Sequence, residues 1–241
     1  MRKSVLPVLL LLLSTASTGY PQPGTAGIPV IEKVKANFGN IQTLKMKVEK
    51  LSYGIDNALA HKTEQTYIYA KPDKHKRVVQ GKIDVVIGKK TYRILPSGKW
   101  KVENEKNSKS LPSLSGLPQF IFNLPEYLNQ YDTSVDNKSG NTVVITAIPK
   151  NGKSQYPQVM VSVDSGKGVV GSVEIYNMHG KLSEKYTVEY FSEPKNTVLF
   201  PKKIKEEIFT PAGKSVTETV ISGLEINAGN LETEFVPVIT K

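Results

Sequence analysis

The feature that most constrains the fold of this chain is an alternation of apolar and polar residues that recurs between short turns. In the first such stretch, Leu44, Met46 and Val48 alternate with charged residues, as in a strand with one face in the core and the other in water. Pro and Gly residues separate comparable runs further along the chain. We predict strands near residues 41–49, 62–70, 76–79, 83–87, 91–95, 99–103, 159–163, 172–176, 186–190, 203–209 and 216–226.

The connections between these strands are too short for parallel pairing, because a parallel crossover needs about a dozen residues or more. Neighbouring strands therefore pair antiparallel, as in a meander. A twisted sheet of about ten strands or more does not stay flat. The predicted fold class is mainly β (α+β), with one large curved antiparallel sheet that forms an incomplete barrel.

Two segments have helical spacing instead. In the first, which follows Pro29, the apolar residues Val30, Ile31, Val34 and Phe38 recur at helical intervals. The second segment spans residues 118–131, and Pro125 should divide it into two short helices. Its apolar residues are Phe120, Ile121, Leu124 and Leu128. We predict an N-terminal helix and a short helical lid over the open side of the sheet.

The strand alternation also predicts the side chains that line the concave face beneath the lid. They are Leu44, Met46, Val48, Tyr67, Tyr69, Val159, Val161, Val163, Tyr186, Val188 and Tyr190. Leu51 and Tyr53 are out of phase with Val48, which hints at a β-bulge in that strand. Because two short helices are too small to fill such a face, an apolar cavity between lid and sheet is expected.

The N-terminus has the features of a secretory signal peptide, which we assign to residues 1–19. Arg2 and Lys3 precede a short apolar run, and small residues follow it, with cleavage after Ala16 or Gly19. The alternative, a transmembrane anchor, would need about 20 apolar residues. Residues 20–27 form a linker rich in Pro and Gly, and residues 28–241 are expected to form a single domain.

The composition limits the function classes that the chain can belong to. It contains no cysteine, which excludes disulfides, thiol nucleophiles and attachment of lipid to a cysteine of the mature chain. Its formal charge is +10, or +8 after loss of Arg2 and Lys3. After export, such a charge favours anionic lipid head groups or acidic partners over nucleic acid.

Residues with catalytic or metal-binding spacing are not recognisable. His61, His75 and His179 lie among turn or charged residues and have no ligand spacing. Carboxylates on the strands could form a glycosidase pair, although outward-facing charges of a half-buried strand explain them equally. We therefore predict no catalytic residue, no metal and no cofactor, and a protein that is not an enzyme.

The densest basic run is K-P-D-K-H-K-R at residues 71–77. It is either the solvated end of a hairpin or a contact for phosphate head groups or an acidic partner. We take Lys71, Lys74 and Arg77 as the candidate basic contact.

Three motifs resemble the outer-membrane lipoprotein carrier and lipoprotein-sorting family (LolA-like). They are Y-I-Y-A-K-P-D at 67–73, V-V-I-G-K-K-T-Y-R-I-L-P at 85–96 and L-E-I-N-A-G-N-L-E-T-E-F at 224–235. The resemblance covers nearly the whole mature chain. In the family's carriers, the residue before the Pro of the first motif is an arginine, and this arginine handles the lid and cargo. This chain has Lys71 at that position. Lysine lacks the planar fork of arginine.

The resemblance implies a half-barrel whose lid covers an acyl-binding cavity. It implies a periplasmic monomer that is not lipidated, carries lipoprotein acyl chains or lipids, and meets transfer proteins of the inner and outer membranes. An alternative on the same fold is an envelope sensor or interaction module, and an enzyme such as a glycosidase or esterase is a third. The lid is expected to be incompletely buried and to be displaced by cargo.

Overall fold

The structure is a computed structural model that describes residues 27–88, 90–94, 99–103, 117–137, 140–150, 157–229 and 231–235. The predicted signal peptide and most of the predicted linker lie outside these residues. One antiparallel 13-stranded sheet dominates the structure, which confirms the predicted fold class.

The helices and strands follow the order that the sequence predicts. They are α1 (Gly27–Gly39), β1 (Thr43–Tyr53), β2 (Leu59–Ala70), β3 (Lys74–Val79), β4 (Lys82–Ile87), β5 (Lys90–Ile94), β6 (Trp100–Glu103), α2 (Gln119–Phe122), α3 (Leu124–Leu128), β7 (Tyr131–Asn137), β8 (Thr142–Pro149), β9 (Gln158–Asp164), β10 (Val169–Tyr176), β11 (Leu182–Tyr190), β12 (Pro201–Thr210), β13 (Gly213–Ile226) and the 3-10 helix η1 (Glu232–Phe235).

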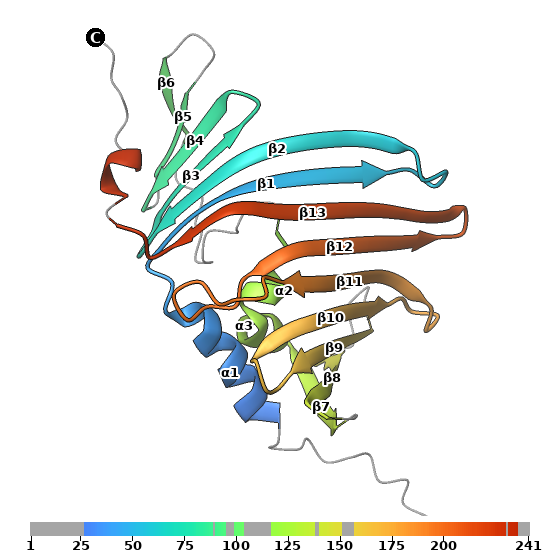
Figure 1. Cartoon of the computed structure of the whole chain (residues 1–241). Coiled ribbons are helices and arrows are strands. Elements are labelled where there is room, and N and C mark those ends of the chain that lie inside the picture. Colours follow the sequence, from blue (N-terminus) through green and yellow to red (C-terminus); the bar gives the residue numbers. More distant parts are fainter. Residues whose placement is uncertain are drawn as a thin grey trace, which may run out of the picture.

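The sheet consists of two meanders joined in its middle. Its strand order is β6-β5-β4-β3-β2-β1-β13-β12-β11-β10-β9-β8-β7, so β1 pairs with β13 and the end strands are β6 and β7. Figure 1 shows the sheet arching over the three α-helices. The sheet is curved but not closed into a barrel, because β6 and β7 lie at opposite edges.

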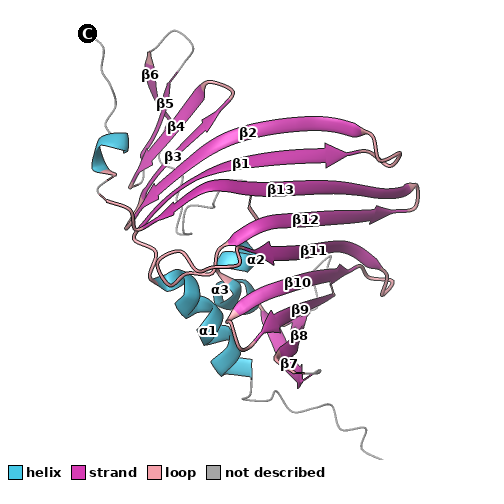
Figure 2. Ribbon diagram, in the orientation of Figure 1, coloured by secondary structure: helices cyan, strands magenta, loops and turns pink. Residues whose placement is uncertain are grey.

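The α-helices lie on the concave side of the sheet, where they are drawn in cyan in Figure 2. Helix α1 precedes the central strand β1, whereas α2 and α3 follow edge strand β6 and precede edge strand β7. The two short helices therefore belong to the segment of chain that connects one free edge of the sheet to the other.

The second helical segment does divide in two, but not at Pro125. Helix α2 ends at Phe122 and α3 starts at Leu124 after the cap residue Asn123. Pro125 lies in the first turn of α3, where the missing N–H has no partner in any helix. The proline therefore helps to start the second helix instead of ending the first.

The β-bulge expected between Val48 and Leu51 is absent from the β1–β2 ladder. The register of β1 on β2 is continuous from Thr43 to Ser52. Leu51 therefore lies on the convex face, and Lys50 and Ser52 continue the concave face. The residue type changes along β1 while the register does not. The concave face of this strand is apolar near the helices and polar toward its far end.

The apolar pattern changes sides within the sheet. In β1 and in strands β8 to β13, the side chains of the main core lie on the concave face. In β2 to β5 a second cluster lies on the convex face, where Phe235 of η1 packs with Ile68, Ala70 and Val85. Ion pairs of Glu234 with Lys45 and Lys76, at 3.0 and 3.2 Å, hold η1 beside β3.

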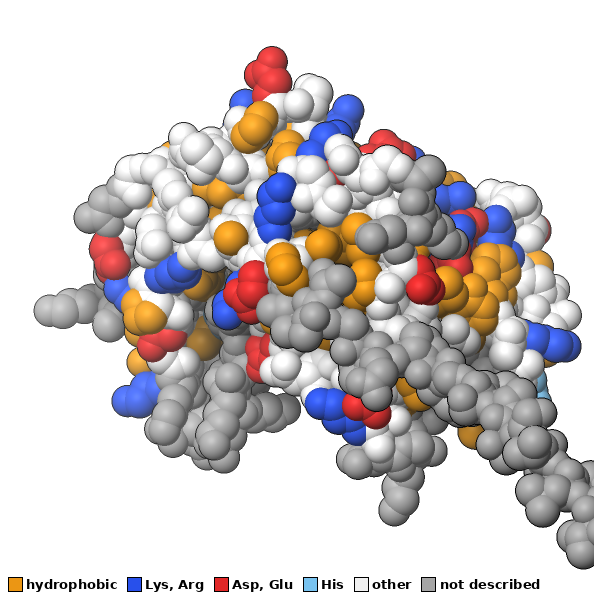
Figure 3. All heavy atoms as spheres, turned by 90° about the horizontal axis from the view of Figure 1, so that it is seen from below, with side chains coloured by type: hydrophobic (Ala, Val, Ile, Leu, Met, Phe, Trp, Pro, Cys, Tyr) orange, Lys and Arg blue, Asp and Glu red, His pale blue; other side chains and the backbone are white. Residues whose placement is uncertain are grey.

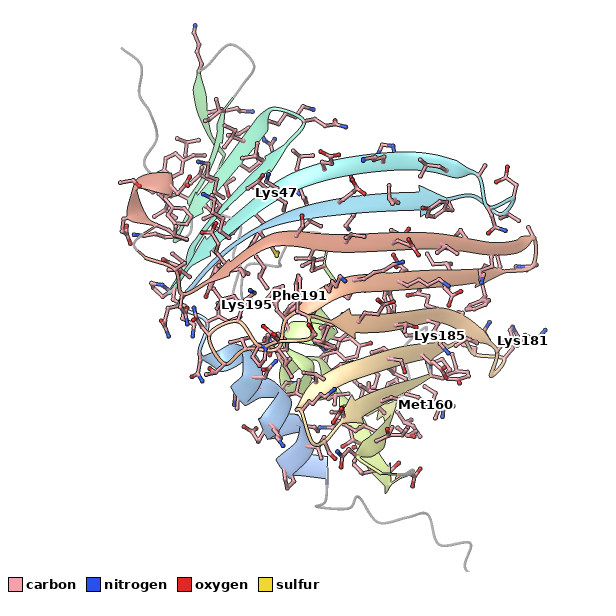
Figure 4. The ribbon with its side chains drawn as sticks, in the orientation of Figure 1. Lys47, Met160, Lys181, Lys185, Phe191 and Lys195 are labelled. Carbon is pink, nitrogen blue, oxygen red and sulfur yellow. The ribbon has the colours of Figure 1, made fainter. Side chains whose placement is uncertain are left out.

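The rest of the convex face is mostly charged, and cross-strand ion pairs cover it. The pairs include Glu174–Lys185, Lys203–Glu218, Glu207–Lys214 and Glu49–Lys62, with N–O distances of 2.9, 2.7, 2.6 and 2.6 Å. Figure 4 labels Lys47, Lys185 and Met160, whose strands β1, β11 and β9 all contribute to this sheet. Such exposed pairs each stabilise a protein little, and they indicate a solvated face.

Candidate functional site

The concave face is the candidate site, and the structure brings the predicted lining residues together on it. Ten of them are buried in the main core: Leu44, Met46, Val48, Tyr67, Tyr69, Val159, Val161, Val163, Tyr186 and Val188. Tyr190 is partly buried and packs against the same core. These side chains share one face because the ladders shift register at only a few positions.

Several lining residues were not predicted from the sequence. Strands β8, β10, β12 and β13 add Ile145, Ala147, Val170, Val173, Ile175, Ile204, Ile221 and Ile226 to the same core, and the connection from β11 to β12 adds Val198 and Phe200. The alternation of apolar and polar residues in β8 and β10 could have predicted their lining residues. Phe200 follows the exposed stretch 192–197, and no local pattern there predicts its burial.

The lid residues Phe120, Ile121, Leu124 and Leu128 all pack into the concave core. The expectation of incomplete burial was wrong, since Ile121 and Leu124 are 0% exposed. Phe120 meets Tyr186 of β11 edge to face, with ring centroids 4.8 Å apart. The helices fill the concave face more completely than their length suggested, because aromatic side chains bury large areas.

An aromatic cluster joins the helices to one another and to the chain beyond β11. The ring of Phe122 on α2 lies 5.1 Å from that of Phe38 on α1 and 5.5 Å from that of Phe200. Figure 4 labels Phe191 and Lys195 in the connection that leads to Phe200. Phe191 is partly buried against the core, and Lys195 is exposed.

Hydrogen bonds also hold α1 in place. Lys33 Nζ donates to the carbonyl oxygens of Ser165 and Gly166, at 2.9 and 2.6 Å. Asn37 donates to the carbonyl of Leu199 and accepts from its N–H, at 2.9 and 3.1 Å. Because α1 has these polar anchors on two separate connections, it is a fixed part of the structure.

The three residues of the predicted basic contact do not form one patch. Lys71 Nζ donates to the carbonyl of Gly39, the last residue of α1, at 2.5 Å, where a cation suits the helix dipole. Lys74 pairs with Glu232 of η1 at 2.5 Å. Arg77 pairs with Asp84 at 3.0 Å and lies on the face opposite to Lys74, as the β3–β4 register shows.

A polar row continues the concave face beyond β2. Met46, Tyr67, Arg77, Asp84 and Arg93 are successive cross-strand partners, so their side chains share one face. Asp84 accepts hydrogen bonds from Arg77 and Arg93 at 3.0 and 2.7 Å. Burial raises the pKa of Asp84, but the hydrogen bonds and positive charges of Arg93 and Arg77 together hold it below its usual value.

Two buried polar atoms next to this row lack a hydrogen-bond partner within the part of the chain that the structure describes. They are the hydroxyl of Tyr67 and Nδ1 of His75, and the two rings stack with centroids 6.3 Å apart. Burial, with a smaller effect of Arg77, lowers the pKa of His75 to about 4. His75 is therefore neutral near pH 7.

The unpartnered hydroxyl leads to a stability prediction. Tyr67→Phe should leave the free energy of unfolding unchanged or raise it by about 1 kcal/mol, because it removes a buried group without a hydrogen bond. Tyr190→Phe is the matched change, and it should lower that free energy by about 1 kcal/mol, since the Tyr190 hydroxyl donates to the carbonyl of Val170 at 2.8 Å. Urea unfolding of both variants measures the difference, and equal losses would contradict it.

Among the described residues, no group of His, Cys, Asp and Glu side chains is arranged to hold a metal ion. No helix in these ranges is long and apolar enough to cross a membrane. Figure 3 views the molecule from below the orientation of Figure 1 and shows hydrophobic side chains interspersed with charged ones on that side.

No family model and no curated protein matches this chain. Solved structures do resemble it. A DUF1329 family protein from Desulfovibrio piger matches with a TM-score of 0.61 and 15% identity, over 89% of this chain and 98% of that one. A LolA superfamily protein from Nitrosomonas europaea matches at 0.54 and 15%, over 86% and 96% of the two chains.

An outer membrane lipoprotein-sorting protein domain from Vibrio parahaemolyticus matches with a TM-score of 0.54 and 17% identity, over 86% of this chain and 94% of that one. At such identities the match concerns the fold. It shows that the chain has a LolA-like fold, as the resemblance of the three sequence motifs implied.

Proposed function

We propose that this protein is a periplasmic carrier that binds acyl chains of lipids or lipoproteins between the concave face of its sheet and helices α2 and α3. The observation that carries the proposal is the apolar concave face of an open sheet, which two short helices cover by apolar and aromatic packing. A structural neighbour that is a lipoprotein-sorting domain supports it.

The energetic need for such a carrier is large. Exposing each methylene group of an acyl chain to water costs about 0.8 kcal/mol, so a lipid with several chains needs an extended apolar surface in transit. The concave core supplies that surface from β1, β2 and β8 to β13. No reaction is needed for this role, and we propose no catalytic residue.

Binding requires the chains to replace the lid side chains on the sheet. Helices α2 and α3 have four and five residues, too short to be stable without tertiary packing. Acyl chains offer the sheet a similar apolar contact. Helix α1 keeps its hydrogen bonds to the turn at Ser165 and to Leu199 during this exchange, so the opening occurs at α2 and α3.

The chain would exchange cargo with transfer proteins of the inner and outer membranes. Residues 71–103 hold ten basic and three acidic residues and account for +7 of the chain's +10. We propose that this basic stretch, including Lys71, Lys74 and Arg77, contacts anionic head groups or acidic partners. The protein is proposed to be exported with cleavage of its signal peptide, to be unlipidated and monomeric, and to bind no nucleic acid.

Displacement of the lid is directly measurable, because the chain has no cysteine and introduced cysteines label cleanly. Spin labels at Glu126→Cys on α3 and Met160→Cys on β9 should report a changed distance distribution when palmitoyl-containing phospholipid is added. Labels at Lys35→Cys on α1 and Met160→Cys are the matched control and should report no change. Mass spectrometry of the protein purified from its own compartment should find bound lipid.

The completeness of the packing in the structure favours one alternative. With Leu124 and Ile121 fully buried, the closed form has a well-packed interior of its own, as a sensor or interaction module on this fold would. Absence of co-purified lipid, together with an unchanged distance between positions 126 and 160, would contradict the carrier and favour that module.

A further inference from the structure

The concave face of the central strands changes from apolar to polar along the strands. Val48 of β1 and Ile221 of β13 are cross-strand partners in the main core. Further along β1, Lys50 lies on the same face, opposite Thr219 of β13. An amphiphile that lies along the strands, with its chains on this core, would therefore have its polar end beside Lys50.

Lys50 is a half-buried cation on this face. Its Nζ makes no hydrogen bond or ion pair with any residue in the part of the chain that the structure describes. Burial lowers the pKa of Lys50, and the negative charge of Glu206 offsets part of this effect. A nearby anion favours the charged form of a buried lysine, so an anionic group of a ligand would stabilise Lys50.

Glu206 of β12 is the anionic counterpart on the same face. It is the cross-strand partner of Tyr186, whose side chain is in the main core and meets the ring of Phe120 on α2. The Tyr186 hydroxyl lies 2.7 Å from Glu206 Oε1 and 3.1 Å from an oxygen of Glu184. Glu206 Oε2 has no hydrogen bond or ion pair within the described ranges. This oxygen is therefore available to a cation.

Strand β13 separates the two charged side chains. Figure 1 shows β13 between β1 and β12. Neighbouring strands are about 4.8 Å apart, so the backbones of β1 and β12 are roughly 10 Å apart. Between them, Thr219 is the partner of Lys50 and Thr217 is the partner of Glu206. Lys50 and Glu206 thus lie on either side of two short hydroxyl side chains.

The residues next to these two in sequence, on the convex face, do form ion pairs. Glu49 pairs with Lys62, and Glu207 pairs with Lys214, both at 2.6 Å. Charges of the convex face are therefore neutralised within the sheet. The two concave charges do not neutralise each other by contact, and their spacing suits a small group that carries both a negative and a positive charge.

We propose that Lys50 and Glu206 form a subsite for lipid head groups that carry both a phosphate and a primary amine, as phosphatidylethanolamine does. The subsite rests on the proposed carrier function and adds the class of ligand to it. Lys50 donates to a phosphate oxygen, and the ammonium group of the ligand donates to Glu206 Oε2. A short linker joins phosphate and amine, so one molecule contacts both side chains. A lipid without these groups binds by its chains alone.

The test compares three fluorescent lipids with identical chains: a phosphatidylethanolamine, a phosphatidylglycerol and a diacylglycerol. Wild-type protein should bind the phosphatidylethanolamine most tightly. Lys50→Gln should weaken binding of both phospholipids about tenfold, since it removes a charge-assisted hydrogen bond. Glu206→Gln should weaken binding of the phosphatidylethanolamine by about the same factor. It should strengthen binding of the phosphatidylglycerol, because a carboxylate that repels phosphate is lost. Neither variant should change the affinity for the diacylglycerol.

Glu207→Gln and Lys47→Gln are the matched controls. Each removes the same kind of charge from a residue on the convex face, of β12 and β1 respectively, and should leave all three affinities unchanged. The opposite responses of phosphatidylglycerol to the Lys50 and Glu206 variants distinguish direct contact from a general loss of stability. Circular dichroism and urea unfolding check that each variant is folded.

The outcomes separate the subsite from the carrier function. If wild-type protein binds none of the three lipids, the carrier function itself fails. If it binds them equally and the Lys50 and Glu206 variants leave the ratios unchanged, the carrier stands and the subsite is wrong. Tighter binding of phosphatidylglycerol than of phosphatidylethanolamine by the wild type would also overturn the subsite. Competition by glycerophosphoethanolamine at the concentration of the lipid would show a site for a soluble ligand and would overturn it as well.

Discussion

Replacing Leu124 by Asp is expected to lower the free energy of unfolding by about 3 kcal/mol or more, because a carboxylate would enter an apolar interior. Leu124 is 0% exposed and packs in the core between α3 and the sheet. The charge must either stay buried or pull α3 from the sheet, and both outcomes destabilise the closed form. Urea unfolding at pH 7 measures the loss.

Leu59→Asp provides the control for that substitution. Leu59 lies at the start of β2 and is 54% exposed, so the same chemical change there should alter the free energy of unfolding by about 0.5 kcal/mol or less. Equal stability of the Leu124 and Leu59 variants would mean that α3 does not pack on the sheet in solution. Increased binding of a hydrophobic dye by the Leu124 variant would show that α3 has left the concave face.

Phe200→Ala is expected to lower the free energy of unfolding by about 3 to 5 kcal/mol, the range for replacing a buried phenylalanine with alanine. Phe200 is 1% exposed and its ring contacts both Phe38 of α1 and Phe122 of α2. The substitution would leave a cavity beside both rings and so weaken the packing of α1 and α2 together. Thermal and urea unfolding measure the loss, with Met178→Ala, at a residue 76% exposed, as a control that should be nearly neutral. A neutral Phe200 variant would refute this role of the cluster.

Much of the fold was predictable because strand alternation is a local property of the sequence. Leu44, Met46 and Val48 reveal the inner face of β1 without any knowledge of its neighbours. The helical spacing of Phe120, Ile121, Leu124 and Leu128 likewise predicted the side of the helical segment that packs inward. Both predictions depend only on residues that are close together in the sequence.

Features that depend on pairing between strands were not predictable from such patterns. The row from Tyr67 to Arg93 exists only because three ladders align those positions. The placement of Phe235 on the convex face depends on contacts more than a hundred residues distant in sequence, such as that with Ile68. The sequence at 71–77 shows that Lys74 and Arg77 are charged, but it does not show that their side chains lie on opposite faces of the sheet.

The position of the β1–β13 ladder makes this sheet a circular permutation of a single uninterrupted meander. If the connection from β6 to α2 were cut and the two natural ends joined, the strands would follow one another from β7 to β13 and then from β1 to β6, each beside its neighbour in sequence. In the natural order, pairs such as Lys47 with Ser222 close a very long loop. Folding slows as contacts become less local, so the natural connectivity puts the costliest pairing in the middle of the sheet. We therefore expect each half to assemble by local hairpins and the pairing of β1 with β13 to be the slow step of folding.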